Sequence, residues 1–410
     1  MLMPGISSPP APRVNHAGGA GLYAAPGIAL RWLTMLSGKP DDRPLRRQRD
    51  WLQMTHSEAD NMLRSCVRAV LVGGICAGLL GWAGAPARAE VNSPTLDAIK
   101  KRGELICGID TGIPGYAFQD SSGEWQGLDV SYCRAIADAV LGSPKKVKFI
   151  PLTAKVRFTV LKSGEIDVLI RDSEHSFKRN TDMGLEEPAV NFFTGQTFMV
   201  RKSLGVKHLK ELDGATMCVE TGTTLETNIA DYNRSNNIKI KTLLFEKPEE
   251  AFAAAESGRC DGYTDDGGSV AAARSTMKTP ADWMFIPETI GGLQPLGPLT
   301  RQGDEAWTRL VKWVHYSMLE AEVLGITKAN TAEKAKNPTD PDVRRFFGVE
   351  GDFGKLLGVD NGWAGRIVMD IGNYGELYEA TFGSNGGLGL PRGMNNLFSN
   401  GGLQTLPTWH

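Results

Sequence analysis

Charged side chains crowd the stretch "RDSEHSFKR" at residues 171–179, directly after the apolar run "IDVLI" at 166–170. Arginines suit carboxylates because a guanidinium group presents its donors as a planar fork, whereas carboxylates suit cations. The stretch therefore predicts a ligand-binding rim, while a solvated loop with ordinary surface charges is an equal alternative. Its charged or titratable members are Arg171, Asp172, Glu174, His175, Lys178 and Arg179.

The elements around this stretch alternate between strands and helices. Apolar residues recur at helical spacing in the helices, and the last helix turns through Ser163-Gly164 into the strand that precedes the charged stretch. We expect strands at 104–110, 146–152 and 166–170, and helices at 93–103, 128–142 and 157–164. This alternation indicates an open α/β sheet with parallel neighbours.

A second set of similar elements follows at 215–266, where "SGRCDGY" echoes the earlier "SGEIDVL" at 163–169. The repetition predicts two α/β lobes. The apolar run at 194–203 is expected to cross between them. The second lobe is expected to end near 295–304, where Pro295 and Pro298 bracket a crossing back, and a helix at 305–325 is expected to pack on the first lobe. Ligands of open α/β sheets bind beyond the carboxyl ends of strands, so two such lobes predict a site in the cleft between them.

Composition limits the class of protein. The chain has 410 residues, 41% of them apolar, which suits two domains with extra segments. Its formal net charge of −2 at pH 7 gives no basic excess, so we expect no nucleic-acid partner.

The segment at 62–89 has the order of a secretory signal peptide. Arginines precede a short apolar run that ends in "APARA", with cleavage expected before Glu90. A membrane anchor is the alternative, but the run is shorter than the ~20 apolar residues that a spanning helix needs. Residues 1–61 are predicted to be an unstructured extension. Because a signal peptide should stand at the start of its chain, Met54 or Met62 is the better start, and a disordered cytoplasmic tail is the alternative.

Several segments together resemble the periplasmic general L-amino acid-binding proteins of ABC importers. They include "LDAIKKRGELICGID", "GLDVSYCRAIADAVLG", "VKFIPLTAKVRFTVLKSGEIDVL", "GTT" and "GLGLPRGMNN", in order from about Thr95 to the C-terminus. The resemblance implies an α/β, two-lobe periplasmic binding protein fold (type II) that closes on an amino acid and delivers it to a membrane permease. It implies no enzymatic activity and no cofactor, and we expect a monomer.

On this basis we divide the exported chain into four parts. The predicted parts are 90–198 as the first portion of lobe one, 199–298 as lobe two, 299–345 as the second portion of lobe one, and 346–410 as a C-terminal extension packing on the lobes.

The resemblance also implies roles for individual residues. Arg179 matches the arginine that binds the ligand α-carboxylate, and Thr223 and Thr224 match hydroxyls that receive the same group at a helix start. Asp266 matches the acid that pairs with the ligand ammonium. Tyr116 and Phe118 fall where aromatic side chains cover the ligand, although a role as ordinary core is equally open for them.

Acidic residues depart from the family pattern. Asp172, Ser173 and Glu174 replace Asn and Thr-Thr, and Asp265 stands where Thr is more common. An ionised carboxylate cannot donate a hydrogen bond to a ligand carboxylate. Three interpretations stay open: the acids pair with Arg171 and Lys178 and turn away, the ligand carries extra positive charge, or ordinary amino-acid binding is lost.

The exported chain has four cysteines, for which an oxidising compartment predicts disulfides. None of them forms a CxxC pair, so we expect no metal site. Spacing alone does not choose among the three connectivities, but bonds between lobes would lock the hinge. We therefore predict Cys107 with Cys133 and Cys218 with Cys260.

Two other functions remain on the same fold. An enzyme similar to cyclohexadienyl dehydratase is conceivable because Glu174 stands beside His175, and a desolvated glutamate can act as a general acid. A binding module that reports its ligand to a sensor is the other alternative.

Overall fold

The computed structural model describes residues 91–409, so the predicted extension and signal peptide lie outside the described residues. The first lobe contains a three-stranded parallel sheet in the order β4-β1-β5. Its strands and flanking helices are β1 (Leu105–Ile109), β4 (Val147–Pro151), β5 (Val168–Leu169), α2 (Pro94–Arg102), α3 (Leu128–Leu141) and α4 (Arg157–Ser163). These elements confirm the predicted alternation.

Local sequence sets the ends of these helices. Ser93 caps the start of α2 by accepting a hydrogen bond from the Leu96 backbone N–H, and Pro94 occupies the first turn, where its missing N–H costs nothing. Gly103 ends the helix with φ 76°, a left-handed conformation that glycine adopts without strain.

The second lobe is built on a six-stranded mixed sheet. Its strands follow the order β11-β7-β10-β8-β9, with β12 paired to β7. The parallel part was predicted, and the antiparallel part arises because β7 and β12 connect the lobes in opposite directions. The elements are β7 (Phe192–Arg201), β8 (Thr216–Glu220), β9 (Lys241–Phe245), β10 (Gly262–Asp266), β11 (Trp283–Phe285), β12 (Ile290–Leu296), α6 (Leu225–Asn236), α7 (Pro248–Glu256) and α8 (Gly267–Thr276).

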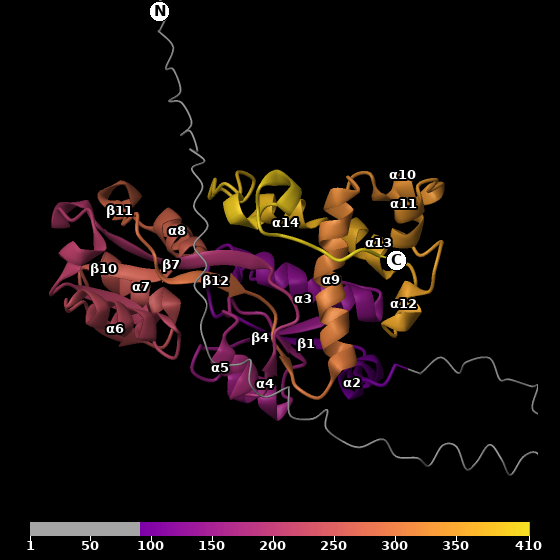
Figure 1. The fold of residues 1–410 in the computed structure, drawn as a ribbon, viewed down its shortest axis with the longest axis horizontal. Coiled ribbons are helices and arrows are strands. Elements are labelled where there is room, and N and C mark those ends of the chain that lie inside the picture. The colour runs from indigo at the N-terminus through magenta and orange to yellow at the C-terminus, as the bar shows by residue number, and fades with distance from the viewer. Residues whose placement is uncertain (1–90, 410) are drawn as a thin grey trace, which may run out of the picture. The chain divides into compact units, whose positions relative to one another are not determined.

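Strands β7 and β12 run between the elements of the two lobes (Figure 1). They pair with each other over Phe192–Gln196, with an irregularity between Ile290 and Gln294. The crossing predicted at 194–203 corresponds to β7, whereas the crossing back, expected near 295–304, is made by β12 at Ile290–Leu296. Two crossing strands form a hinge of the kind that lets lobes close on a ligand.

The C-terminal part of the chain packs on the first lobe. Helix α9 (Glu305–Val323) lies against α3, as predicted, and α13 and α14 pack on both (Figure 1). Asn395 also exchanges hydrogen bonds with the backbone of Phe193 in β7. The other elements are β2 (Phe118–Gln119), β3 (Trp125–Gln126), α5 (Phe177–Thr181), β6 (Leu185–Glu186), β13 (Thr300–Arg301), α10 (Thr331–Lys336), α11 (Pro341–Phe346), α12 (Phe353–Leu356), α13 (Trp363–Asp370) and α14 (Tyr374–Thr381).

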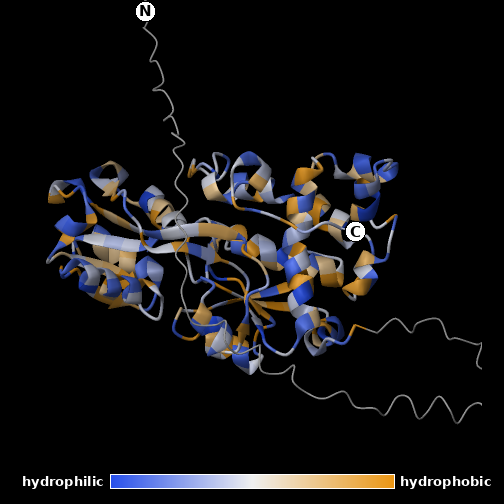
Figure 2. Cartoon of the chain, viewed as in Figure 1, coloured by the Kyte–Doolittle hydropathy of each residue, from blue (hydrophilic) through white to orange (hydrophobic). Residues whose placement is uncertain are grey.

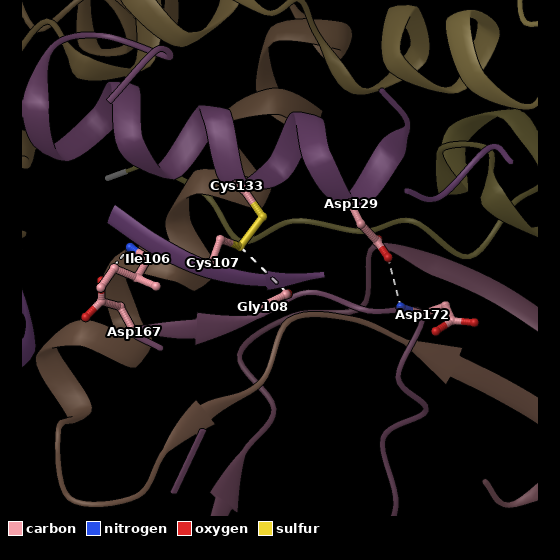
Figure 3. Close-up of a disulfide and its surroundings, with 7 residues drawn as sticks. All are labelled: Ile106, Cys107, Gly108, Asp129, Cys133, Asp167 and Asp172. Atoms are coloured by element: carbon pink, nitrogen blue, oxygen red, sulfur yellow. Dashed lines mark hydrogen bonds between the residues drawn. A yellow bond between two sulfur atoms is a disulfide. The ribbon is translucent and has the colours of Figure 1, made fainter. Parts of the chain in front are cut away.

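Both predicted disulfides are confirmed, and each lies within one lobe. Cys107 of β1 is bonded to Cys133 of α3, which fastens the helix to the sheet (Figure 3). Cys218 of β8 is bonded to Cys260, just before the neighbouring strand β10. Neither bond restrains the crossing strands.

The core of the first lobe is large and rich in aromatic side chains. Helix α3 is buried along most of its length, and α9 combines buried apolar residues with hydrophilic ones, seen as orange and blue turns (Figure 2). Trp307, Trp363 and Tyr374 are among its fully buried members. This packing holds the C-terminal helices firmly to the sheet whose strand ends face the site.

Candidate functional site

Residues of both lobes surround a space of about 380 Å³, part of it open to solvent, and we call it the interlobe cavity. Its walls come from the ends of strands β5, β8 and β10, from the starts of α4 and α6, and from crossing strand β12. The lining residues are Arg157, Arg171, Asp172, Glu174, Arg179, Glu220, Thr223, Thr224, Leu225, Asp265, Asp266, Gln294 and Leu296.

Two arginines stand at one end, which we call the arginine end. The guanidinium carbons of Arg157 and Arg179 lie 4.5 and 4.9 Å from the centroid of the same ring, that of Phe158. Arg179 sits in the short helix α5, whose start is capped by the Ser176 hydroxyl, and its Nη1 donates to the carbonyl oxygen of Glu174. Burial lowers the pKa of both arginines, which remain cations at neutral pH.

A third arginine is already neutralised by the protein. Arg171 is fully buried, and its Nη2 lies 2.7 Å from Asp110 Oδ2 and 2.6 Å from Glu220 Oε1. Glu220 belongs to lobe two, so this ion pair joins the lobes. Burial opposes the charge of Arg171, but its acidic partners outweigh it and raise its pKa. Its role is to bridge the lobes rather than to offer free donors.

The start of α6 closes the cavity from lobe two. Thr224 is the residue that precedes the helix, yet its side chain makes no capping hydrogen bond, and the Thr223 hydroxyl donates to the Glu220 carbonyl oxygen. Both residues line the cavity. A helix of this length places free N–H donors and a partial positive charge at its start, which favours an anion there.

Three aspartates form what we call the acid end: Asp172 of lobe one and Asp265 and Asp266 of lobe two. One carboxylate oxygen from each lies within 4.8 Å of the others. Asp265 and Asp266 are the last two residues of strand β10, all of whose residues are buried, and the chain then turns into α8. Carboxylates this close repel one another unless a cation or proton is shared among them.

Hydrogen bonds from the protein hold two of these carboxylates in place. Asp266 caps α8, since its Oδ1 accepts hydrogen bonds from the backbone N–H groups of Gly268 and Ser269 and from the Tyr116 hydroxyl at 2.8 Å. Asp265 accepts from the Tyr263 hydroxyl and from the Asp266 backbone. Their orientations are therefore fixed by several donors.

Asp172 is held differently, through its backbone. It adopts φ 34°, in the left-handed region that non-glycine residues rarely enter. Its backbone N–H donates to Asp129 Oδ2 at 2.8 Å, and Asp129 stands at the start of α3 (Figure 3). This bond supports a strained conformation at a cavity wall, where such strain is commonly found.

Burial governs the ionisation of the acid end. It raises the pKa of Asp172, Asp265 and Asp266 above the usual value, because a charge in a dry cavity lacks the solvation of water. Arg171 opposes the shift at Asp172, and hydrogen bonds oppose it at Asp266. The buried Asp129 behaves similarly, with a pKa raised to about 7.

The charged stretch from the sequence does line the cavity, but not with all its members. Asp172 lies 3.3 Å from an Arg171 nitrogen, as the first interpretation of the extra acids expects, yet Asp172 and Glu174 also face the cavity. Glu174 Oε2 is buried and has no hydrogen-bond partner among the described residues. His175 is half-buried outside the lining, with a pKa lowered to about 4 by burial, and Lys178 is exposed.

The two aromatic candidates lie elsewhere. Phe118 is in the short strand β2 and lines a separate cavity with Gln126 and Leu388, because β2 folds back on β3 at the outer side of the loop. Tyr116 is buried in the first-lobe core, packed edge-on against Phe192 and Phe382. It reaches the site only through its hydroxyl, which contacts Asp266.

Several lining residues were not predicted from the sequence. Arg157 is the first residue of α4, Glu220 is the last residue of β8, and Gln294 lies on crossing strand β12. The rule that sites lie beyond the carboxyl ends of strands would have found the first two. Nothing in the local sequence marks Gln294.

Comparison with known proteins gives consistent matches. Residues 105–331 match the family of bacterial extracellular solute-binding proteins, family 3. The glutamate/glutamine/aspartate/asparagine-binding protein BztA of Rhodobacter capsulatus is 47% identical over 77% of this chain and 93% of its own. The general L-amino acid-binding periplasmic protein AapJ of Rhizobium johnstonii is 45% identical over 77% of this chain and 93% of its own.

A solved structure is similar over the same extent. The periplasmic binding protein of an ABC transporter from Brucella ovis, with glutathione bound, has 44% sequence identity and a TM-score of 0.73. The match covers 76% of this chain and 98% of that one. These relatives are binding proteins, which supports a transport function over the dehydratase alternative. The chain therefore belongs to the bacterial extracellular solute-binding proteins, family 3.

Proposed function

We propose that the protein captures an L-amino acid with a positively charged side chain and delivers it to the membrane permease of an ABC importer. The observation that carries this proposal is one cavity between the lobes that is lined both by two arginines flanking the Phe158 ring and by a cluster of three aspartates. An amino acid carries the complementary pattern, a carboxylate beside an ammonium group.

The arginine end suits the α-carboxylate. Arg179 can offer a bidentate fork, and Thr223 and Thr224 stand at the start of α6, where backbone donors favour an anion. Arg179 belongs to lobe one and the two threonines belong to lobe two, so one bound carboxylate would contact both lobes. Closure would then depend on the ligand, since contacts from both lobes exist only in the closed form.

The acid end suits more than one positive charge. Asp266 alone could pair with the α-ammonium group, yet Asp172 and Asp265 lie beside it, and Glu174 also faces the cavity. The lining holds three arginines and five acids, so with every group ionised the acids exceed the arginines by two. A net cationic ligand would offset this excess.

The names of the relatives describe other or broader sets of ligands. BztA takes glutamate, glutamine, aspartate and asparagine, as its name states, and AapJ is a general L-amino acid-binding protein. The acids that depart from the usual pattern favour a different preference here. A neutral or acidic ligand would leave several buried carboxylates without a cationic partner, which costs free energy.

Location and partner complete the proposal. Among residues 91–409, no helix combines the length and apolar character needed to cross a membrane. We place the protein in the periplasm, exported by the segment at 62–89, where family members such as AapJ act. Its partner there would be an inner-membrane permease.

A melting-temperature screen tests the proposal. Each L-amino acid is added at millimolar concentration to the protein purified without its signal peptide, after unfolding and refolding to remove any bound ligand. A ligand that binds only the folded state raises the melting temperature. We expect arginine, lysine or ornithine to give the largest rise, and a largest rise with glutamate or aspartate would contradict the proposed preference.

A further inference from the structure

Arg157 is a buried arginine that the protein itself leaves without a partner. Its exposed fraction is 2%, it lines the interlobe cavity, and its Nε and Nη1 atoms are buried without a hydrogen-bond partner among the described residues. The guanidinium group stacks over Phe158, which is the next residue of α4. A stacked ring supports the group but accepts none of its N–H donors in a normal hydrogen bond.

An unpartnered guanidinium in this position is costly. A buried ion needs a counter-charge and partners for its donors, and the loss of either costs several kcal/mol in general. The nearest arginines, Arg171 and Arg179, repel it, and together with burial they lower its pKa. An additional negative charge at this point would relieve the repulsion.

The two acids that raise the pKa of Arg157, Glu220 and Asp172, are already engaged. Glu220 Oε1 accepts from Arg171 at 2.6 Å and from the Ala154 backbone N–H at 3.2 Å. Asp172 lies beside Arg171 as well. The donors of Arg157 are therefore left for a group that enters the cavity from outside the chain.

The position of Arg157 indicates what that group is. Its guanidinium flanks the same Phe158 ring as that of Arg179, so both arginines belong to one end of the cavity. We propose that Arg157 is a second carboxylate-binding residue, which holds the ligand's α-carboxylate together with Arg179. This inference rests on the proposed function, because it assumes an amino-acid ligand.

Charge favours one shared carboxylate over two separate ones. Acids already outnumber arginines in the lining by five to three. A ligand with a second carboxylate would add to the negative excess, whereas a single carboxylate shared by two guanidinium groups adds the least negative charge. Two forks around one carboxylate would also fix its orientation.

A purely structural role is the competing explanation, in which Arg157 only packs on Phe158 at the start of α4. The two roles differ in their dependence on the ligand's charge. A carboxylate-binding residue discriminates between an amino acid and its α-carboxamide, while a packing residue affects both ligands equally.

The test compares arginine with argininamide by titration calorimetry in wild-type protein and in Arg157→Ala. We expect Arg157→Ala to weaken arginine binding about 10- to 100-fold and argininamide binding less than about threefold. The ratio of the affinity for arginine to the affinity for argininamide should therefore fall. Equal weakening of both ligands in Arg157→Ala, with the ratio unchanged, would overturn the inference.

Two further variants guard against loss of folding. Arg157→Lys keeps the charge without the fork, and we expect it to recover part of the ratio. Arg134→Ala is the matched control, because Arg134 also stacks on a ring, that of Phe149, but lies outside the interlobe cavity. In Arg134→Ala, the ratio of the affinity for arginine to the affinity for argininamide should equal the wild-type ratio. Wild-type protein that binds neither arginine nor any other amino acid of the screen would overturn the proposed function and this inference together, a pattern distinct from an unchanged ratio.

Discussion

At the arginine end of the cavity, Arg157 has buried donors without partners, whereas at the acid end Asp266 accepts hydrogen bonds from Tyr116, Gly268 and Ser269. The buried donors at the arginine end lack acceptors, so this end favours an anion. At the acid end, hydrogen bonds from the protein hold carboxylates in place, and the three carboxylates repel one another. The arginine end should therefore govern affinity through direct hydrogen bonds, and the acid end should govern selectivity through charge.

Removal of Arg179 is expected to have the largest effect. Arg179→Ala leaves the ligand carboxylate without its charged fork and should weaken binding of every amino acid by about 2 to 4 kcal/mol, with Lys recovering only part. Titration calorimetry measures the loss. Lys178→Ala is the matched control, since Lys178 is the exposed neighbour in the same helix, and it should bind like wild type. Equal affinities in Arg179→Ala and wild type would rule out Arg179 as the anchor.

Asp265→Asn tests the acid end and should have the next largest effect. Asparagine keeps the shape and the acceptor oxygen that receives the Asp266 backbone N–H, but it removes one negative charge. We expect arginine binding to weaken about tenfold, near 1.4 kcal/mol, with little change for the neutral isostere citrulline. An equal change for both ligands would mean that Asp265 acts through structure rather than through charge.

The affinity for a cationic ligand should rise with pH. Burial raises the pKa of Asp172 and Asp265 in the free cavity, and a bound cation would lower these pKa values, so the complex holds fewer protons than the free protein. Binding then releases protons and strengthens as pH rises, by up to about tenfold per pH unit for each proton released, until the carboxyls are ionised in the free protein.

Calorimetry in two buffers of different ionisation enthalpy measures the number of protons directly. Citrulline should release fewer protons than arginine. Proton uptake on binding arginine would contradict the assignment of the acid end as a cation site.

Glu174→Thr should have the smallest effect on affinity and a clear effect on selectivity. It supplies the hydroxyl common in the family and removes a charge whose Oε2 has no hydrogen-bond partner among residues 91–409. We expect binding of neutral amino acids to strengthen and binding of arginine to weaken, each by a few-fold, about 0.5 to 1 kcal/mol. Glu174→Gln separates the loss of charge from the change of size. Unchanged selectivity in both variants would show that this side chain does not act on the ligand.

The sequence predicted much of this fold because its signals are local. The helix at Leu128–Leu141 has clear apolar spacing and ends at Gly142, and the crossing strand Phe192–Arg201 is a plain apolar run. The disulfides were also predictable, since Cys218 and Cys260 lie at neighbouring strands of one sheet. The mixed direction of the second sheet was missed, because strand direction depends on the crossing connections rather than on the strands themselves.

The site was predictable only in part. Asp266 ends strand β10 and Arg179 lies in α5, the helix that follows β5, so their place at the cavity agrees with the general rule for α/β sheets. The lack of partners at Arg157 could not be predicted, because it depends on Arg171 having already taken Glu220. The sequence left two roles open for Phe118, because its position depends on how the loop folds back between β2 and β3.

The most direct test of the central claim is calorimetric titration of wild-type protein with arginine and with citrulline at neutral pH. The two ligands share size and shape, and they differ in the charge at the end of the side chain. If the acid end selects a second positive charge, arginine should bind at least about tenfold more tightly, equivalent to 1.4 kcal/mol. Citrulline binding as tightly as arginine, or more tightly, would contradict the account.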